Sequence, residues 1–386
     1  MQKKLLVAAL GTLFAIPALA DSAPADASAV SVTGYLDAGY TNMNSTGLFG
    51  TNANNSLSRV FDTPKASIGN NFSGLNLNQA AITVSDQPKE GLGGVLNLTG
   101  GQDANVIASY GAGNLGGNAY NNNHSLDITQ AYGSYVAGPW TIIAGKFVTL
   151  AGAETINGTT DTNYSRSILF GYAIPFTHTG ARVTYAASDA VSLIVGVNQG
   201  WDQVKDTNSD KTVELGFTAT PSKMFSLAGS YYGGKELASG FAGPLNQTTN
   251  GSRQLYDLVG TINATDQLSF VLNYDNGSQD KASTADANGN NTAKWDGLAA
   301  YANYQFSEKW HASFRTEYLN DKDGYRTGTV QNWKENTLTV AYLPTKTLEL
   351  RGEIRGDSSD KSVFLNSNGT SKSNQTSYGL EALYKF

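Results

Sequence analysis

From Val30 onward, the chain consists of segments of about ten residues in which apolar and polar side chains alternate. Such alternation is the period of a β-strand whose two faces meet different surroundings. In 348–355, the clearest example, leucine, glycine and isoleucine alternate with four charged residues. Four charges on one face enter a dry core only at a large desolvation cost, whereas they can line water. The sequence therefore predicts strands with one apolar side and one water-facing side.

The connections between these segments alternate in length. Short links lie at 86–93, 136–139, 187–189, 221–223, 264–266, 305–308 and 343–346, and long links rich in Asn, Gly, Ser and Thr lie at 42–74, 103–124, 148–176, 200–210, 235–251, 276–293, 320–330 and 358–374. A soluble β-sandwich also has alternating strands, but it has no reason to sort its connections by length. Short turns on one side and long loops on the other are typical of outer-membrane barrels.

We therefore predict an all-β fold, a transmembrane antiparallel up-and-down β-barrel of about sixteen strands with long extracellular loops and short periplasmic turns. The predicted strands are 30–41, 75–85, 94–102, 125–135, 140–147, 177–186, 190–199, 211–220, 224–233, 252–263, 267–275, 294–304, 309–319, 331–342, 347–357 and 375–386. Counts of 14–18 strands fit the pattern, because 94–102 and 140–147 alternate weakly. A barrel of this size leaves an aqueous channel.

The first residues indicate export. Lys3 and Lys4 precede an apolar run, and Ala18-Leu19-Ala20 forms a small-residue cleavage site. This is the layout of a secretory signal peptide, so we expect residues 1–20 to be removed and 21–386 to form a single outer-membrane barrel. The chain has no cysteine, so it forms no disulfide. Its formal net charge of −6 argues against nucleic acid as a partner. An exported, cysteine-free β pattern points to the outer membrane of a Gram-negative bacterium.

The link 148–176 is rich in aromatic and hydroxyl side chains and contains Glu154, Asp161 and Arg166. A connection this long is usually functional or disordered, and its composition argues against disorder. We expect it to fold inward as a constriction loop, with these three charges setting the pore size and a transverse field. The alternative is a loop that packs over the rim and stabilises the barrel. Lys146 and Arg182 border this link, and each could contact a solute or merely pair with an acid.

The strand register places a set of charged side chains in the lumen. They are Asp37, Arg182, Glu214, Arg253, Asp257, Asp275, Arg315, Glu317, Glu335, Glu349, Arg351, Glu353, Arg355, Glu381 and Lys385. Acids outnumber bases, and rings of side-chain charge bias ion selectivity, so we expect a weak preference for cations. The candidates for pore lining or constriction are Lys146, Glu154, Asp161, Arg166, Arg182, Arg315, Glu317, Glu349, Arg351, Glu353 and Arg355.

Three short stretches in the middle of the chain carry a family resemblance. They are Gly145-Lys146-Phe147, Asn163-Tyr164-Ser165-Arg166-Ser167 and Pro175-Phe176-Thr177-His178-Thr179-Gly180-Ala181-Arg182, with Gln130-Ala131-Tyr132 and Asn78-Gln79-Ala80 upstream. Together they resemble the central signature of the putative beta-barrel porin-2 family (OmpL-like). The resemblance implies an outer-membrane porin through which small hydrophilic solutes and ions diffuse passively. It implies no catalytic residues and no cofactor.

The resemblance also suggests partners. The last strand ends at aromatic Phe386, similar to the signal by which outer-membrane barrels are recognised for insertion. We therefore expect contact with the barrel assembly machinery and with outer-membrane lipid. Trimer formation is common among porins, so a homotrimer is a further expectation.

Two other functions stay open for a barrel of this kind. One is a surface-exposed structural or adhesive barrel. The other is an outer-membrane hydrolase that would use the hydroxyls and histidine around Ser165 and His178. The three histidines, His124, His178 and His311, lie at no metal-ligand spacing, and no phosphate-binding glycine motif opens a helix. We therefore expect neither an enzyme nor a metal site. Of these functions, only a porin has to conduct.

Overall fold

The computed structural model describes residues 30–45, 61, 73–109, 126–237, 250–282, 292–366 and 368–386. Within them, sixteen antiparallel strands form a closed barrel in which each strand pairs with its neighbours along the chain, and β1 closes the ring against β18. The barrel strands are β1 (Ser31–Met43), β2 (Ser73–Asp86), β3 (Gly91–Gly100), β4 (Leu126–Ala137), β5 (Trp140–Val148), β6 (Thr177–Ser188), β7 (Val191–Asn198), β8 (Thr212–Ser222), β9 (Phe225–Leu237), β10 (Asn250–Asn263), β11 (Leu268–Gln279), β12 (Ala293–Gln305), β13 (Trp310–Asp321), β14 (Gln331–Tyr342), β15 (Leu348–Ser359) and β18 (Asn374–Lys385). The predicted up-and-down barrel is confirmed, with sixteen strands rather than fourteen or eighteen. The predicted signal peptide, 1–20, lies outside the described residues.

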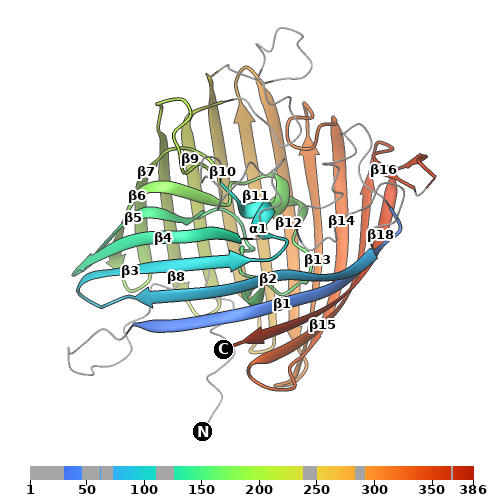
Figure 1. The fold of residues 1–386 in the computed structure, drawn as a ribbon, viewed down its shortest axis with the longest axis horizontal. Helices are drawn as coiled ribbons and strands as arrows, with labels where there is room; N and C mark the ends of the chain where they lie inside the picture. Colours follow the sequence, from blue (N-terminus) through green and yellow to red (C-terminus); the bar gives the residue numbers. More distant parts are fainter. Residues whose placement is uncertain are drawn as a thin grey trace.

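The two ends of the barrel differ in their connections (Figure 1). At one end, which we call the turn end, the links are 87–90, 138–139, 189–190, 223–224, 264–267, 306–309 and 343–347. The opposite end, the loop end, carries the long connections. Phe386 lies at the turn end, where Gly34 N donates to its carbonyl at 2.9 Å across the closing pair of strands.

Several strands continue further toward the loop end than the alternation predicts. β11 continues past the expected end at 275 to Gln279, which pairs with Arg253 of β10. Asn, Gly and Ser have low strand propensity, but pairing with a neighbouring strand overrides that preference. A separate hairpin, β16 (Phe364–Leu365) with β17 (Ser371–Lys372), precedes β18. Its two-residue strands are too short to show any alternation, so it was not predicted.

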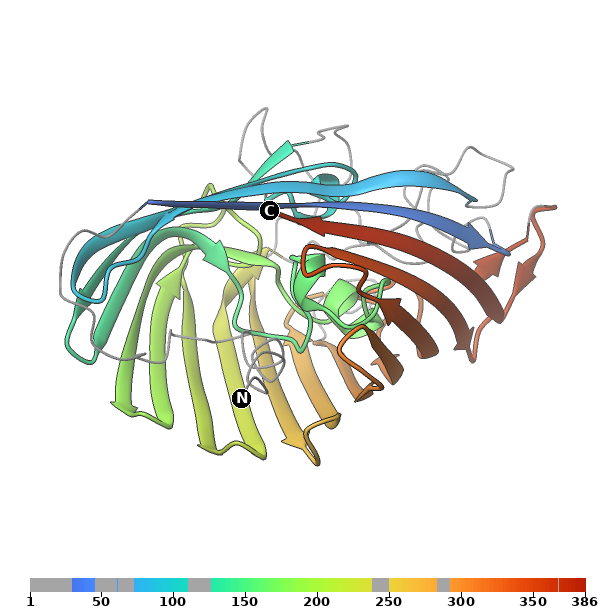
Figure 2. The ribbon, with the colours of Figure 1, turned by 90° about the horizontal axis from the view of Figure 1, so that it is seen from below.

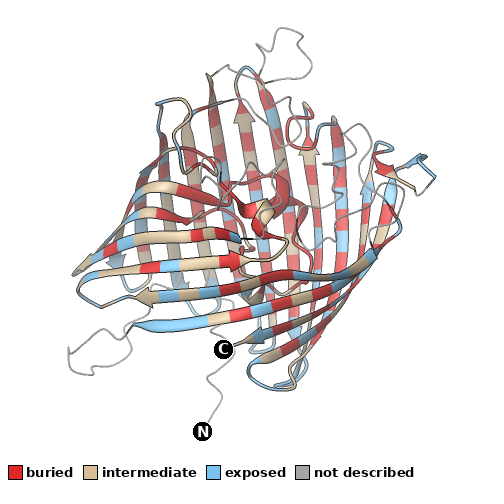
Figure 3. Cartoon of the chain, viewed as in Figure 1, coloured by how far each residue is buried: buried red, intermediate tan, exposed pale blue. Residues whose placement is uncertain are grey.

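Many barrel strands, β14 and β15 most clearly, alternate between buried inner residues and exposed outer residues (Figure 3). On β15, Glu349, Arg351, Glu353 and Arg355 are buried, whereas Leu350 and Ile354 are exposed. Exposed aliphatic side chains form a band around the outside, including Leu193, Val195, Leu215, Leu258, Leu272, Leu338, Leu350 and Leu380. The outer face is thus apolar and the inner face is polar, as a strand that separates lipid from a hydrated interior requires.

Paired aromatic rings lie at the turn end of the outer surface. The pairs, with their centroid distances, are Trp140 with Tyr185 at 4.5 Å, Trp310 with Tyr342 at 4.6 Å, Tyr304 with Phe306 at 5.0 Å, and Tyr384 with Phe386 at 6.2 Å. Amphipathic rings in such a belt are typical of the boundary between lipid and water.

Helical structure is sparse in the described residues. It comprises α1 (Ala104–Ile107), the 3₁₀ helix η3 (Gly158–Thr160) and α2 (Ile168–Tyr172). None of the helices in the described ranges is both long and apolar enough to cross a membrane.

Candidate functional site

Residues 149–176 connect β5 to β6, and we call them the inserted segment. Figure 2, which views the barrel along its interior, shows the helices of this segment inside the ring of strands. Its first residues attach to the inner wall one strand at a time, from β9 to β12. The hydrogen bonds are Leu150 N to Tyr232 Oη at 2.8 Å, Gly152 N to Asp257 Oδ2 at 3.1 Å, Ala153 N to Asn273 Oδ1 at 3.1 Å, and Tyr301 Oη to Glu154 Oε1 at 3.1 Å.

Two wall carboxylates accept hydrogen bonds from the backbone of the inserted segment. Glu353 of β15 accepts from Tyr164 N at 2.8 Å and from Ser165 N at 3.1 Å. Glu317 of β13 accepts from Ile168 N at 2.6 Å and from Leu169 N at 3.1 Å. The Ile168 and Leu169 amides open α2 and have no acceptor inside the helix, so Glu317 satisfies donors that would otherwise be unpaired.

Arginine side chains of the wall donate hydrogen bonds to backbone carbonyl groups of the same segment. Arg351 Nη2 donates to Asp161 O at 2.7 Å, and Arg355 Nη1 donates to Arg166 O at 2.7 Å. Arg315 Nη1 of β13 donates to Ser165 O at 2.6 Å. On β15, the Glu353 carboxylate therefore accepts from backbone N–H groups of the inserted segment. The guanidinium groups of Arg351 and Arg355 on the same strand donate to its backbone C=O groups.

Arg315 is the centre of an ion-pair network. Its guanidinium lies 2.6 Å from Glu154 Oε1 of the inserted segment and 2.9 Å from Glu335 Oε2 of β14, and it lies 3.7 Å from Glu317 Oε1. A second network joins Arg351 to Glu349 and Glu381. Fully buried charges are tolerated only with such partners, because desolvation opposes each of them.

Within the inserted segment, Arg166 Nε lies 2.9 Å from Asp161 Oδ2 and donates to Thr155 O at 3.0 Å. Burial raises the pKa of the Asp161 carboxyl to about 7, with Arg166 opposing the rise and the Glu154 charge adding to it. The three charged residues of the predicted constriction loop therefore have different partners. Asp161 and Arg166 contact each other, whereas Glu154 contacts Arg315 on the wall.

The two basic residues that border the segment pair with strand residues. Lys146 Nζ lies 3.2 Å from Asp127 Oδ2 on β4. Arg182 binds Glu214 of β8 through Nε at 2.5 Å and Nη2 at 2.8 Å, and its guanidinium lies 4.3 Å from the ring centroid of Phe147. Lys146 and Arg182 were each expected either to contact a solute or to pair with an acid, and the contacts observed for both are pairs with an acid.

All eleven candidate residues are buried, with exposed fractions between 0 and 8%. The polar inner face was expected to line open water. Over the inserted segment it instead contacts protein, because the segment occupies the interior and pairs with the charges. The role of these residues in lining or narrowing a pore stays a prediction.

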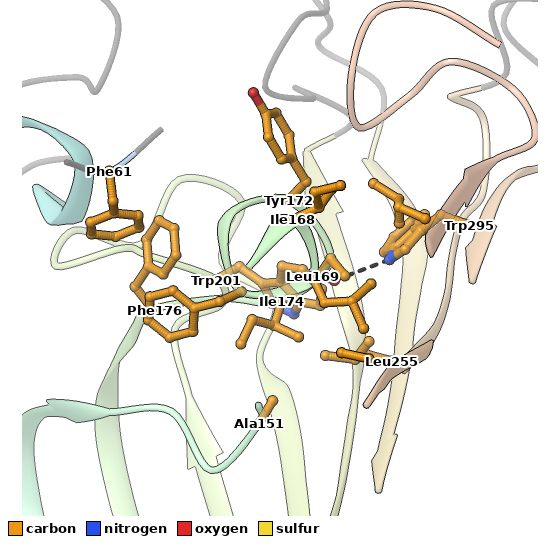
Figure 4. Packing of buried hydrophobic residues seen from close by; sticks show 14 of the residues in the cluster. Phe61, Ala151, Ile168, Leu169, Tyr172, Ile174, Phe176, Trp201, Leu255 and Trp295 are labelled. Carbon is orange, nitrogen blue, oxygen red and sulfur yellow. Dashed lines mark hydrogen bonds between the residues drawn. The ribbon is translucent and has the colours of Figure 1, made fainter. Parts of the chain in front are cut away.

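The interior also contains an apolar cluster that the sequence did not predict. Side chains of the inserted segment pack against inward-facing aromatic and aliphatic residues of the wall. In Figure 4, Leu169 and Ile174 lie beside Trp295 and Leu255, and Trp295 Nε1 donates to Ala173 O at 3.0 Å. The sequence feature that could have predicted this cluster is the set of inward-facing aromatic residues on β12 and β14, because a wall that faces only water does not require them.

Tyr164 explains two strand glycines. Its hydroxyl lies 2.9 Å from Thr41 Oγ1 of β1, and its ring covers the neighbouring strands β1 and β18. A Cβ at Gly39 would lie 2.3 Å from the Tyr164 hydroxyl oxygen, and a Cβ at Gly379 would lie 2.5 Å from Tyr164 Cδ1. Only glycine allows this close approach.

A cavity of about 520 Å³ lies between the inserted segment and the inner wall. Thr33, Lys385 and Phe386 line it at the turn end, and Tyr301 and Asn303 of β12 line its far wall. Neither Tyr301 nor Asn303 was a candidate from sequence. Their inward positions in an alternating strand were the signal, but they carry no charge to draw attention.

Ser165 and His178, the two residues named for the hydrolase alternative, each contact other residues of the described structure. The Ser165 hydroxyl accepts from Arg355 Nη1 at 3.3 Å, while His178 Nδ1 lies 3.1 Å from Gly200 O and its ring stacks on Tyr232. Among the residues that the structure describes, no three His, Asp or Glu side chains are grouped to hold a metal ion.

The family described as putative beta-barrel porin-2, OmpL-like, matches residues 29–386. No curated protein matches the chain in sequence.

Solved structures of similar fold are outer-membrane proteins. The channel DcaP of Acinetobacter baumannii has a TM-score of 0.56 at 14% identity, covering 95% of this chain and 100% of its own. An anion-selective porin from Comamonas acidovorans has a TM-score of 0.60 at 10% identity, covering 93% and 99%. OmpT of Vibrio cholerae in its trimer form has a TM-score of 0.56 at 12% identity, covering 94% and 100%. At these identities, the likeness shows the fold.

Proposed function

The chain belongs to the putative beta-barrel porin-2 family (OmpL-like), and from this premise we propose that it is an outer-membrane porin for passive diffusion of small hydrophilic solutes and ions. The observation that carries the proposal is the closed sixteen-stranded barrel with its polar inner face. A barrel of this strand number is too wide for its own wall side chains to fill, so it encloses a hydrated interior. The apolar outer band suits the surrounding lipid.

The inserted segment is proposed to narrow this channel. It bonds to β9 through β13 on one side, and on the other side Tyr164 reaches Thr41 of β1 while Gln79 Nε2 of β2 donates to Ile156 O at 2.9 Å. A segment fixed to opposite walls must cross the interior. These contacts favour a constriction over a loop that packs only on the rim.

A weak preference for cations is a finer part of the proposal. Acidic side chains outnumber basic ones on the inner wall, and fixed charge in a pore raises the local concentration of counter-ions. The preference is expected to be weak, because several of these acids are already paired with arginine.

The test is single-channel recording of refolded residues 21–386 in a planar bilayer. Stable stepwise openings in potassium chloride are expected, and the reversal potential in a salt gradient should indicate excess cation flux. A silent bilayer, with insertion verified independently, would contradict an open channel. A reversal potential of zero or of opposite sign would contradict only the cation preference.

Export and assembly complete the proposal. Residues 1–20 would direct the chain across the inner membrane, and the last strand, ending at Phe386, would be recognised by the barrel assembly machinery. The trimer form of OmpT, a similar fold, supports a homotrimer. Light scattering in mild detergent should then give three times the monomer mass, and a monomer would contradict the trimer.

A further inference from the structure

The cavity beneath the inserted segment has an unusual lining for a barrel with so many inner charges. Hydroxyl and amide side chains are numerous in it, and we call this space the threonine cavity after Thr33, Thr83, Thr129 and Thr261 on its walls. Thr155, Thr159, Thr160 and Thr162 of the inserted segment add further hydroxyls. Aromatic and aliphatic side chains, among them Tyr301, Val259 and Val271, form the apolar part of the lining.

Charge is nearly absent from the threonine cavity. Its only charged side chains in the described part of the chain are Glu154, Asp161 and Lys385. Glu154 is neutralised by Arg315 at 2.6 Å, and Asp161 is neutralised by Arg166 at 2.9 Å. Lys385 is half-buried at the turn end. An ion placed deep in the cavity would therefore find no free counter-charge, and it would lose its hydration.

Asn303 is a lining residue of this cavity whose amide nitrogen is itself buried in the wall. Its Oδ1 accepts from Ser313 Oγ at 2.7 Å, but its Nδ2 has no partner in the described structure, although the residue is only 8% exposed. Thr261, which also lines the cavity and is buried, makes no side-chain hydrogen bond to any other described residue.

We propose that the threonine cavity is a binding site for a small uncharged polyhydroxylated solute, of the size of a monosaccharide. The volume of about 520 Å³ falls within the usual range for small-molecule sites, roughly 300–1,000 Å³. A neutral polyol supplies both donors and acceptors for the hydroxyl and amide groups of the lining. It places no charge beside Glu154 and Asp161, the paired acids of the inserted segment. The inference rests on the proposed channel function and names the solute class for it.

Three probes with one carbon skeleton separate the solute classes. Glucose is neutral, gluconate is anionic and glucosamine is cationic. Each is added to the refolded 21–386 protein in a planar bilayer, and blockage of the potassium chloride current is measured against its concentration. Glucose is expected to block at the lowest concentration. Titration calorimetry of the protein in detergent with glucose measures the same binding without conduction.

Variants locate the site. Asn303→Leu removes a lining amide at nearly constant volume, and Thr261→Val removes a lining hydroxyl in the same way. Each should weaken glucose binding by roughly threefold to tenfold, as expected for the loss of one neutral hydrogen bond. The matched control is Asn198→Leu. Asn198 is also a buried inward asparagine, but it does not line the cavity. The control should leave glucose binding unchanged.

The outcomes separate the inference from the proposed function. A conducting channel that shows no glucose blockage and no calorimetric binding would overturn the inference and leave the channel intact. Tighter blockage by gluconate or glucosamine would overturn the uncharged solute class. Equal weakening in Asn198→Leu and Asn303→Leu would overturn the location. A silent bilayer together with glucose binding would support the site and contradict the open channel.

Discussion

At the scale of single residues, Arg315 holds together three acids from different strands and from the inserted segment. It contacts Glu154, Glu335 and Glu317, and each of these carboxylates is buried. Replacing it with methionine keeps much of the side-chain volume but leaves this acid cluster without its central cation. Breaking a buried ion pair from one side typically costs about 3–5 kcal/mol. We expect Arg315→Met to lower the free energy of unfolding by that amount, measured by urea titration in lipid vesicles.

The matched control for this variant is Lys334→Met. Lys334 lies on the neighbouring strand β14, exposed on the outer side. Its removal should change the free energy of unfolding by less than about 1 kcal/mol, since Lys334 lies near the end of β14, where a charge on the outer face costs only about 0–1 kcal/mol. Equal effects of the two variants would show that the network around Arg315 is not what stabilises the interior.

Asp161 gives the stability of the folded chain a pH dependence of defined sign. Burial raises the pKa of its carboxyl from 3.8 to about 7. Between these pH values, the folded chain keeps a proton that the unfolded chain has lost. The contribution of Asp161 to the free energy of unfolding therefore falls as pH rises through this window, by at most about 1.4 kcal/mol per pH unit.

Asp161→Asn removes this titration while keeping the shape of the side chain. Wild type should therefore lose stability relative to the variant between pH 5 and pH 8, in paired urea titrations. Asp189→Asn, in an exposed turn, is the control. The difference in free energy of unfolding between wild type and Asp189→Asn should be the same at pH 5 and at pH 8. A difference between wild type and Asp161→Asn that is the same at both pH values would contradict the raised pKa.

At the scale of elements, the inserted segment is fixed on both sides of η3. Glu154 binds Arg315 before it, and Ser165 binds Glu353 after it. The three residues Gly158–Thr160 between these anchors include two that line the threonine cavity. We expect their deletion to raise the single-channel conductance, because less protein then crosses the channel. The length-preserving double variant Thr159→Ser, Thr160→Ser is the control, and conductance unchanged by the deletion would argue against a constriction.

The strands could be predicted from sequence because alternation is a local property. Residues 348–355 show it with charges alone, and they lie on β15 with the expected inner and outer faces. The partners of those charges could not be predicted. Arg315 and Glu154 are separated by 161 positions, and Glu353 and Ser165 by 188. Glu353 also binds backbone amides, and a backbone amide is present at almost every residue, so the side-chain pattern does not identify it.

At the scale of the whole molecule, the barrel reverses the usual distribution of polarity. Its exposed band is aliphatic, and aromatic pairs mark its turn end. The inner wall combines paired charges with an apolar cluster around the inserted segment. Both faces follow from one fact, that every strand separates two different environments. The depth of each outward residue in the bilayer should therefore determine how much a charged substitution there lowers the free energy of unfolding.

Leu258 and Phe306 test this dependence on depth. Leu258 lies near the middle of β10 and faces outward, whereas Phe306 lies in a link at the turn end. Arginine on the lipid face costs about 2–4 kcal/mol at the bilayer midplane and about 0–1 kcal/mol near the interface. Urea titration in lipid vesicles should place Leu258→Arg in the first range and Phe306→Arg in the second. Equal costs at both positions would mean that the band does not face lipid along its full height, and a larger cost at Phe306 would place the membrane boundary beyond the turn end.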